Sequence, residues 1–369
     1  ITEIIFLCKF AEKLKTMSGF YSLPVSEVNR ETPNAVSITF TIPDELKDIF
    51  SFKAGQYITI KHTIDDTELR RAYSICCAPD SGKLKVCVKK VEKGLFSVFA
   101  NTKLKVGDTL EVFPPEGKFV FDPKDDEANS ISNHYAAFVA GSGITPVLSI
   151  VKTVLNEMPD STFLLVYGNQ SLSETMFHSE ILALQKKYKD RLFVEFIYSR
   201  KLENEALFGR IERSTVNLLL KNKFKDRTFN SFYLCGPEPM IDEVSSTLKE
   251  NGINEKQILF ELFNTAEKGL LTKKHEGDTQ VTITLDDEVE TFSMPQKKSV
   301  LEAALDHDLD PPYSCQGGIC STCIARITEG KAEMRKNQIL TDDEIADGLI
   351  LTCQAHPTTA TLSVDYDDV

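Results

Sequence analysis

The chain has 369 residues, a length that predicts two or three domains. Its 42 Lys and Arg residues stand against 55 Asp and Glu residues, which gives a formal net charge of −13 at pH 7. This charge argues against a nucleic-acid-binding protein, because such binding depends on basic contacts to phosphate. No apolar run approaches the roughly 18 to 20 residues needed to span a bilayer, and the apolar patch at residues 4–7 is too short for a secretory signal. We therefore predict a cytoplasmic protein that has neither a membrane nor a nucleic acid as partner.

The first segment in chain order, residues 1–17, precedes sequence that is typical of a folded domain. The chain begins with Ile1, whereas Met17 stands directly before that domain. We expect residues 1–17 to be a non-native or flexible extension, with a native amphipathic start as the alternative.

Short strands and turns dominate residues 18–125. Residues 36–40 and 57–60 alternate with a period of two, as β-strands do. Glycine and proline separate such runs, and one helical stretch at residues 95–101 interrupts them. Many short strands with regular turns predict a small antiparallel β-barrel. Further strands are expected at residues 71–77, 84–91 and 109–113.

Residues 131–263 show a different pattern, in which apolar strands alternate with longer helices. This alternation predicts an α/β domain, a parallel sheet covered by helices on both faces. The expected strands are residues 136–140, 163–167, 193–198 and 232–234, and the expected helices are residues 144–158, 176–189 and 240–251.

The last part of the chain is strongly acidic. Residues 264–278 are polar and without periodicity, so we predict a linker there. Residues 279–369 contain 6 basic and 17 acidic residues, a net charge of −11, which indicates a separate domain. In this domain we expect a hairpin of residues 281–285 and 290–294, a helix at residues 299–306 and a cysteine-rich loop.

Four of the nine cysteines lie in the acidic domain, with the spacing C-x4-C-x2-C and one distant cysteine. This spacing is the plant-type pattern for four thiolates that hold a [2Fe-2S] cluster. A zinc site is the alternative, although zinc sites more often pair two C-x2-C motifs. The segment resembles a plant-type ferredoxin domain, and the resemblance implies an α+β fold of the β-grasp type. The predicted cluster ligands are Cys315, Cys320, Cys323 and Cys353, whereas Cys8, Cys76, Cys77 and Cys87 are expected to be structural.

Three short motifs follow one another in the predicted barrel: Arg71-Ala72-Tyr73-Ser74, Val86-Cys87-Val88-Lys89 and Gly94-Leu95-Phe96-Ser97. The first motif alone is a weak signal, and a core barrel tyrosine is the alternative interpretation of Tyr73. Together the three motifs resemble the flavin site of the ferredoxin-NADP reductase superfamily. The start of the helix at Gly94 would offer free N–H groups to a second phosphate, which favours FAD over FMN.

The resemblance implies a role for three side chains of the first motif. Arg71 would bind the flavin pyrophosphate, since Arg is a bidentate partner of phosphate. Tyr73 would stack on the isoalloxazine ring, since an aromatic face packs on a flat ring. Ser74 would reach the reactive N5 atom.

A glycine-rich turn follows the predicted strand at residues 136–140 and opens a helix. This context suits a nucleotide pyrophosphate at a helix N-terminus, and a plain tight turn is the alternative. In the reductase superfamily this turn has the form G-x-G-x-x-P, and a C-G-P motif lies beside the nicotinamide. The resemblance therefore implies that Cys235 lies near the hydride-bearing carbon, and makes it a candidate catalytic residue with Tyr73 and Ser74. The two motifs comprise Gly141, Gly143, Thr145 and Pro146, and Cys235, Gly236 and Pro237.

The nucleotide is expected to be NADPH, with NADH as the alternative. Ser199 and Arg200 follow the predicted strand at residues 193–198 and match the pair that grips the 2′-phosphate in plant-type reductases, where Arg210 could assist. A solvated loop arginine is the other interpretation of Arg200. Phe263 is the candidate cover on the nicotinamide side of the flavin, and a core phenylalanine is the alternative.

The order of the three domains predicts an electron-transfer reductase. Hydride from NADPH would pass to FAD, and single electrons would leave through the cluster. The same order resembles the reductase components of multicomponent oxygenases. Residues 71–76, 112–119 and 261–265 look like the reductase family of ring-1,2-phenylacetyl-CoA epoxidases. This resemblance implies a multisubunit di-iron oxygenase of phenylacetate catabolism as the electron acceptor.

Two other functions compete with this prediction. The chain could serve another oxygenase, such as a Rieske dioxygenase or a steroid hydroxylase, which only the partner would distinguish. It could instead be a redox-sensing or electron-carrying interaction protein without fast NAD(P)H turnover. Fast turnover with a dye acceptor would exclude that second alternative.

Overall fold

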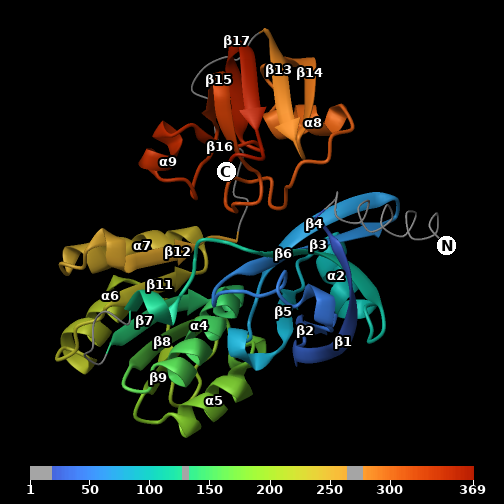
Figure 1. Ribbon diagram of the computed structural model, residues 1–369. Helices are drawn as coiled ribbons and strands as arrows, with labels where there is room; N and C mark the ends of the chain where they lie inside the picture. The colour runs from blue at the N-terminus through green and yellow to red at the C-terminus, as the bar shows by residue number, and fades with distance from the viewer. Residues whose placement is uncertain (1–18, 127–132, 264–276) are drawn as a thin grey trace. The chain divides into compact units, whose positions relative to one another are not determined.

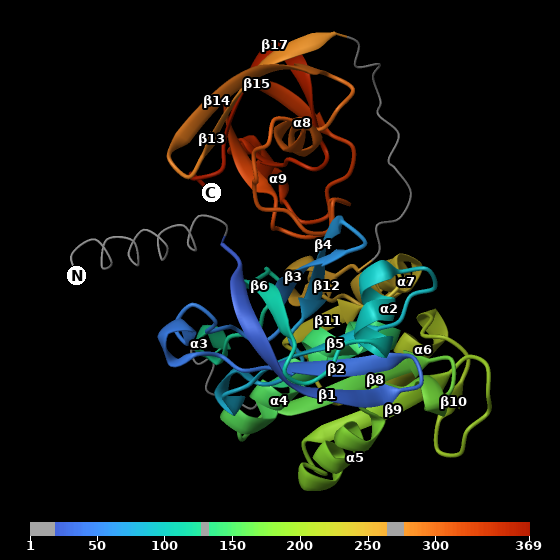
Figure 2. The same ribbon diagram turned by 90° about the vertical axis from the view of Figure 1, so that its right-hand side faces the viewer.

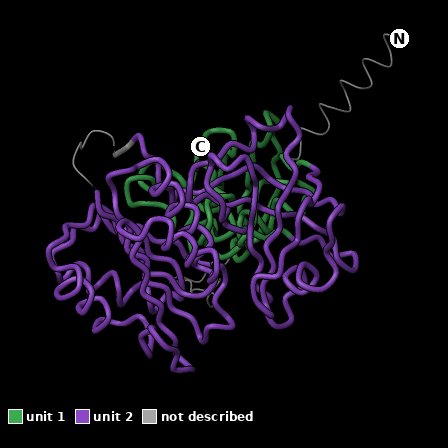
Figure 3. Tube along the Cα trace, turned by 90° about the horizontal axis from the view of Figure 1, so that it is seen from below, with its two compact units in different colours: residues 1–21, 70–72, 264–369 green, residues 22–69, 73–263 purple. Residues whose placement is uncertain are grey.

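The computed structural model describes residues 19–126, 133–263 and 277–369 (Figure 1). The predicted extension at residues 1–17 and nearly all of the predicted linker lie outside the described residues. The chain forms two compact units (Figure 3). One unit consists of residues 22–69 and 73–263, and the other contains residues 277–369 together with residues 19–21 and 70–72. Within the described residues, no helix has the length and apolar character to cross a membrane.

The first sheet has six strands in the order β4-β3-β6-β1-β2-β5. Its strand pairs β1–β2, β2–β5 and β3–β6 are antiparallel. A bridge between Ile75 and Val86 connects the end of β4 to β5, so the two outer strands meet and the sheet curls back on itself as a barrel. The strands are β1 (Tyr21–Thr32), β2 (Ala35–Phe40), β3 (Tyr57–Ile64), β4 (Thr67–Ser74), β5 (Leu84–Lys89) and β6 (Thr109–Glu116).

Helix α2 (Leu95–Thr102) packs beside β5 (Figure 2) and buries Phe96 and Ala100. A short helix, α3 (Pro123–Asp126), follows the barrel. Two features differ from the sequence-based prediction. The strand expected at residues 71–77 ends at Ser74, because the chain leaves β4 there to bridge to β5. Strand β1 was not predicted, although Tyr21, Leu23 and Val25 alternate with serine or proline in its first half.

The second sheet has the order β10-β9-β8-β7-β11-β12, and its neighbouring strands are all parallel. Helices α4 and α5 lie on one face, and α6 and α7 lie on the other (Figure 1). The strands are β7 (His134–Ala140), β8 (Thr162–Asn169), β9 (Leu192–Tyr198), β10 (Leu207–Phe208), β11 (Ser231–Cys235) and β12 (Ile258–Glu261). The helices are α4 (Ile144–Glu157), α5 (His178–Lys187), α6 (Arg213–Leu218) and α7 (Glu238–Glu250).

One apolar core joins the barrel to the parallel sheet. Cys76 and Phe119 of the barrel belong to the same buried cluster as Val139, Leu148 and Tyr167 of the α/β part. Burial of apolar surface is the main favourable contribution to folding. The two sheets of this unit are therefore stabilised by each other as well as by their own strands.

The third sheet is mixed, in the order β14-β13-β17-β15-β16. Its central β13–β17 pair is parallel and its other pairs are antiparallel. Helix α8 (Val300–Asp306) begins at Ser299, whose side chain forms a reciprocal capping box with Glu302. The other elements are β13 (Asp278–Leu285), β14 (Glu288–Pro295), β15 (Ile324–Met334), α9 (Asp342–Ala346), β16 (Leu349–Leu351) and β17 (Ala355–Asp365). The three sheets confirm the predicted fold class.

Candidate functional site

Strand β4 ends with the two residues expected to face a flavin. The ring of Tyr73 lies 5.6 Å from that of Phe96 on α2, at an interplanar angle of 37°. Ser74 is buried, and its hydroxyl donates to a carboxyl oxygen of Glu261, 3.3 Å away. Arg71 is exposed, and its guanidinium donates to the main-chain carbonyl of Arg70. The barrel thus brings an aromatic pair and a buried hydroxyl together at one end of a strand, next to Ala72.

The first turn of α2 is shaped to accept an anion. Ser97 fixes the turn, since its hydroxyl accepts from the N–H of Val91 and donates to the carbonyl of Gly94. Within the described part of the chain, no side chain caps this helix, so its first N–H groups remain free for a phosphate. A Cβ at Gly94 would lie 2.5 Å from the Ser97 hydroxyl, which leaves room only for glycine. These features fit the pyrophosphate of FAD, with Leu95 and Phe96 in the same turn.

The turn that is expected to bind the second nucleotide follows β7. Gly141 has a φ of +55°, a conformation that favours glycine, and Gly143 begins helix α4. A Cβ at Gly143 would lie 2.1 Å from the carbonyl oxygen of Cys235. Helix α4 also lacks a side-chain cap among the described residues, while Thr145 and Pro146 are buried in its first turn. This turn fits the pyrophosphate of a dinucleotide.

The flavin and nucleotide motifs approach each other within one unit. The ammonium of Lys89, on the strand β5 that also carries the buried Val88, lies 3.8 Å from the position of a Cβ at Gly141. Gly236, with the exposed Pro237 after it, also packs tightly, because a Cβ there would lie 3.2 Å from Ala140.

Glu261 is a buried carboxyl group that the sequence-based prediction did not include among the site residues. It lies on β12 directly beside Cys235 of β11 and accepts the hydrogen bond of Ser74. Burial raises the pKa of Glu261 to about 8, and the hydrogen bond from Ser74 offsets part of that effect. Burial also raises the pKa of Cys235, and the nearby Glu261 adds to the rise. The carboxyl group of Glu261 and the thiol of Cys235 therefore both keep their protons at neutral pH, and the Ser74 hydroxyl is hydrogen-bonded to the former.

Replacing Glu261 with Gln should remove a pH dependence of stability. Glu261 keeps its proton up to about pH 8 in the folded chain but has an ordinary pKa of 4.5, so the free energy of unfolding falls as the pH rises between these values. We expect the thermal midpoint of the wild-type chain to fall by about 5 °C or more from pH 6 to pH 9, and that of Glu261→Gln to fall much less. Thermal release of flavin fluorescence measures both. Glu92→Gln, at an exposed position, should behave as the wild type; an equal decline in Glu261→Gln would contradict the assignment.

The residues expected to bind the 2′-phosphate lie beyond the ends of β9 and β10. Strand β10 pairs with the end of β9, and the N–H of Gly209 donates to the carbonyl of Tyr198. Ser199 donates to the carbonyl of Asn169, while the side chains of Arg200 and Arg210 are exposed. The pairing thus carries both arginines to the same edge of the parallel sheet. Phe263 lies just after β12 and is 37% exposed, so it is not a core residue.

The four predicted cluster cysteines come together in the third sheet's domain. Hydrogen bonds between side chains join Cys315 to Cys320 and Cys353, and Cys353 to Cys323. These contacts hold the pKa of Cys315 below its ordinary value. The four cysteines form no disulfide. Among the described residues, no group of three or more His, Cys, Asp or Glu side chains, these four cysteines included, is arranged to hold a metal ion. A [2Fe-2S] cluster places a different demand on the four sulfurs, because it divides them between two irons.

The loop around these cysteines fits a [2Fe-2S] cluster. The N–H of Gly317 donates to the sulfur of Cys315, 3.3 Å away. The buried hydroxyl of Ser314 has no hydrogen-bond partner within the described residues, and a cluster sulfide is the acceptor that such a donor suits. A Cβ at Gly318 would lie 2.6 Å from the carbonyl oxygen of Lys336, which explains glycine in this tight loop. Four thiols with inward N–H donors are the donor set of a plant-type cluster.

Comparison with protein families gives the same three parts in the same order. Residues 22–121 match the oxidoreductase FAD-binding domain, and residues 138–246 match the oxidoreductase NAD-binding domain. Residues 283–358 match the 2Fe-2S iron-sulfur cluster binding domain.

Two characterised relatives are similar over nearly their whole length. The chain is 37% identical to a subunit of the 1,2-phenylacetyl-CoA epoxidase of Escherichia coli (strain K12), over 95% of this chain and 99% of the relative. It is 34% identical to the ferredoxin reductase component of 3-ketosteroid-9-alpha-monooxygenase of Rhodococcus rhodochrous, over 93% and 96%. Among solved structures, phthalate dioxygenase reductase shares the fold, with a TM-score of 0.59 and 22% identity over 94% of this chain and 98% of that one.

Proposed function

Since the chain belongs to the family of reductase components with FAD-binding, NAD-binding and [2Fe-2S] domains, we propose that it carries electrons from NADPH to a di-iron oxygenase of the phenylacetyl-CoA epoxidase type. The enzyme class follows from the family, and the nucleotide, the acceptor and the individual site residues are proposed. The observation that carries the choice of acceptor is the 37% identity to the epoxidase subunit over 95% of the chain.

The proposed roles of the residues follow from their surroundings. FAD, when bound, accepts a hydride, and a [2Fe-2S] cluster carries single electrons. The free N–H groups at the starts of α2 and α4 would bind the pyrophosphates of FAD and NADPH. Ser74 donates to Glu261, and the buried pair excludes water from the end of β4. Cys235 supplies a neutral, apolar surface next to that pair, because burial raises the pKa of its thiol.

The proposal is tested by anaerobic absorbance titration of the purified chain with NADPH and, separately, with NADH. We expect about 1.5 equivalents of NADPH to bleach the flavin and cluster bands, because FAD takes up two electrons, the cluster takes up one and each NADPH supplies two. Bleaching of the flavin alone would show that the two centres are not coupled, and no response would overturn the reductase function. Addition of a phenylacetyl-CoA epoxidase oxygenase complex should then restore both bands in air together with product formation.

A second candidate acceptor is a steroid hydroxylase. It is favoured by the 34% identity to the reductase component of the 3-ketosteroid monooxygenase, which also extends over nearly the whole chain. The two candidates are distinguished by supplying each oxygenase in turn. The rate of NADPH oxidation coupled to hydroxylated product decides between them.

Arg200→Ala should distinguish the two nucleotides. A charge-assisted hydrogen bond to phosphate contributes about 1.5 to 3 kcal/mol, and 1.4 kcal/mol corresponds to a factor of ten. We therefore expect the KM for NADPH to rise by about tenfold or more, while the KM for NADH changes less than about twofold. Lys201→Ala, at the adjacent exposed residue, is the matched control and should leave both values unchanged. An equal rise for both nucleotides would refute a contact with the 2′-phosphate.

A further inference from the structure

Helix α4 is hydrogen-bonded to the segment that directly follows β4, the strand that carries the proposed flavin-binding residues Tyr73 and Ser74. The side chain of Lys152 donates to the carbonyl oxygen of Cys76, 2.9 Å away. One turn earlier in α4, the hydroxyl of Ser149 donates to the carbonyl oxygen of Cys77, 2.6 Å away. Cys76 is only two residues beyond Ser74, so these two hydrogen bonds tie the end of β4 to the helix.

The same helix also contacts the nicotinamide-side motif at its other end. Gly143, the N-cap residue directly before Ile144, packs so closely on the carbonyl of Cys235 that no side chain fits between them. Helix α4 is therefore in contact with the backbone next to Ser74 and with the backbone of Cys235. Because a helix is a rigid element, its position relates these two groups to each other.

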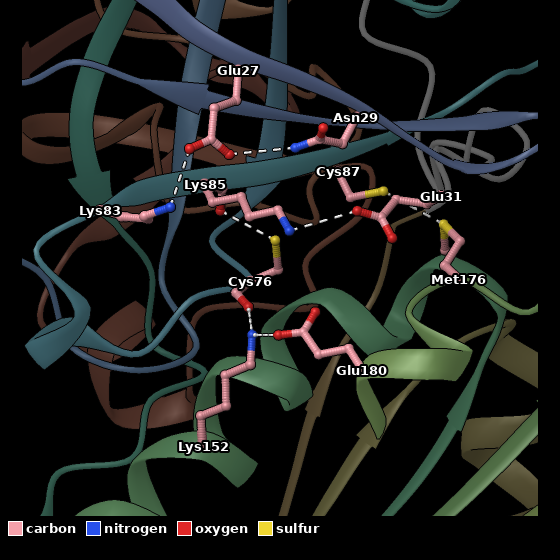
Figure 4. A network of polar contacts seen from close by, with 10 residues as sticks. All are labelled: Glu27, Asn29, Glu31, Cys76, Lys83, Lys85, Cys87, Lys152, Met176 and Glu180. Carbon is pink, nitrogen blue, oxygen red and sulfur yellow. Dashed lines mark hydrogen bonds and ion pairs between the residues drawn. The ribbon is translucent and has the colours of Figure 1, made fainter. Parts of the chain in front are cut away.

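The ammonium of Lys152 is held in place from both sides. It lies 2.6 Å from the carboxylate of Glu180 on α5, and the Lys152 side chain is only 15% exposed. Figure 4 shows Lys152 pointing from α4 toward both Glu180 and the Cys76 carbonyl. The ammonium is well ordered, because the Glu180 carboxylate and the Cys76 carbonyl occupy two of its three N–H donors.

A second lysine in the same network provides a comparison. Lys85 on β5 forms an ion pair with Glu31 at 3.5 Å (Figure 4). Its ammonium also lies over the ring of Phe177. The hydrogen bonds between Lys85 and Cys76 use the Lys85 main chain, whose carbonyl accepts from the Cys76 N–H and from the Cys76 thiol. Removal of the Lys85 side chain therefore leaves the hydrogen bonds between α4 and the end of β4 intact.

We propose that Lys152 is a positioning residue for hydride transfer, acting through the Cys76 carbonyl on the placement of Ser74 relative to the nucleotide-binding turn of α4. The inference rests on the proposed reduction of FAD by NADPH. Reacting groups must be held within a fraction of an ångström, and a misplacement of about 1 Å can reduce the rate by roughly a hundredfold. Lys152 touches neither nucleotide motif, so its loss should change the rate of hydride transfer and not the affinity for NADPH.

The test compares Lys152→Met, Lys152→Arg and Lys85→Met in the full holoprotein by stopped-flow reduction with NADPH. We expect Lys152→Met to lower the limiting rate of flavin reduction by about tenfold, with the dissociation constant for NADPH changed less than about twofold. Visible circular dichroism of the bound flavin should change in the same variant. Lys152→Arg retains a donor for the Cys76 carbonyl and should recover most of the rate.

The outcomes separate this inference from the proposed function. An unchanged limiting rate in Lys152→Met, or an equal loss in Lys85→Met, would overturn the positioning role while leaving the reductase function standing. Failure of the wild-type flavin to be reduced would instead overturn the proposed function. Ser149→Ala provides an independent variant if Lys152→Met does not bind FAD. It removes the neighbouring hydrogen bond to Cys77 and should lower the limiting rate without weakening NADPH binding.

Discussion

Cys353→Ser is expected to abolish the absorbance and electron-transfer function of the cluster while NADPH still reduces the flavin. Cys353 is buried, and its side chain is hydrogen-bonded to those of Cys315 and Cys323. It therefore completes the group of four thiols. Serine supplies a hard oxygen where the cluster needs a soft thiolate. We expect the visible cluster bands and the iron content to fall to a small fraction of the wild-type values, and reduction of a one-electron protein acceptor to fall by about a hundredfold.

Two measurements on the same samples make this expectation specific. NADPH-dependent reduction of a dye that accepts electrons directly from flavin should remain within about twofold of the wild-type rate. Cys87→Ser is the matched control, since Cys87 is equally buried but lies in the barrel, and its cluster bands should be unchanged. Retention of the full cluster spectrum in Cys353→Ser would exclude Cys353 as a ligand.

Gly143→Ala is expected to have the second large effect, on hydride transfer from the nucleotide. Gly143 has an ordinary helical φ of −59°, so alanine brings no backbone strain of its own. The added Cβ would lie 2.1 Å from the Cys235 carbonyl oxygen, whereas Cβ atoms essentially never approach other atoms closer than 3.0 Å. The turn and the end of β11 must therefore move apart by about 1 Å, which should lower kcat/KM for NADPH by about a hundredfold.

Ser142→Ala is the matched control for this substitution. Ser142 lies in the same turn and contributes its main-chain carbonyl to the hydrogen bond of Thr145, which alanine preserves. The control should retain kcat/KM within about threefold, and both variants should retain bound FAD and the cluster bands. If Gly143→Ala had the same kcat/KM for NADPH as Ser142→Ala, hydride transfer would not depend on the close packing of Gly143 against Cys235.

The sequence predicted those parts of the site whose residues lie close together in the chain at a characteristic spacing. The C-x4-C-x2-C motif needs only a short loop to bring three sulfurs together, and the glycine turn after β7 is defined by a strand, a turn and a helix in direct succession. The parallel sheet was predicted for the same reason, because its strands are continuous apolar runs. The role of Phe263 as a cover of the flavin stays a prediction.

The parts that the sequence did not predict depend on contacts between distant segments. Glu261 stands in an ordinary apolar strand, and only the pairing of β12 with β11 and the approach of Ser74 make it a buried site residue. Lys152 occupies a position in the sequence that is typical of the solvent-facing side of an amphipathic helix. Its ammonium nevertheless forms a hydrogen bond with the carbonyl of Cys76 in the barrel. The short elements β10 and α6 were missed because residues 199–218 are polar and show no period.

The apolar core that the barrel shares with the parallel sheet limits how this chain could be recombined in evolution or engineering. Cys76 and Phe119 bury their surfaces against side chains of the α/β part, so separating the two would expose an apolar face on each. Residues 22–263 should therefore be kept together whenever the chain is recombined, fused to another domain or expressed in part. Cutting the chain between the barrel and the α/β part should yield two fragments that aggregate.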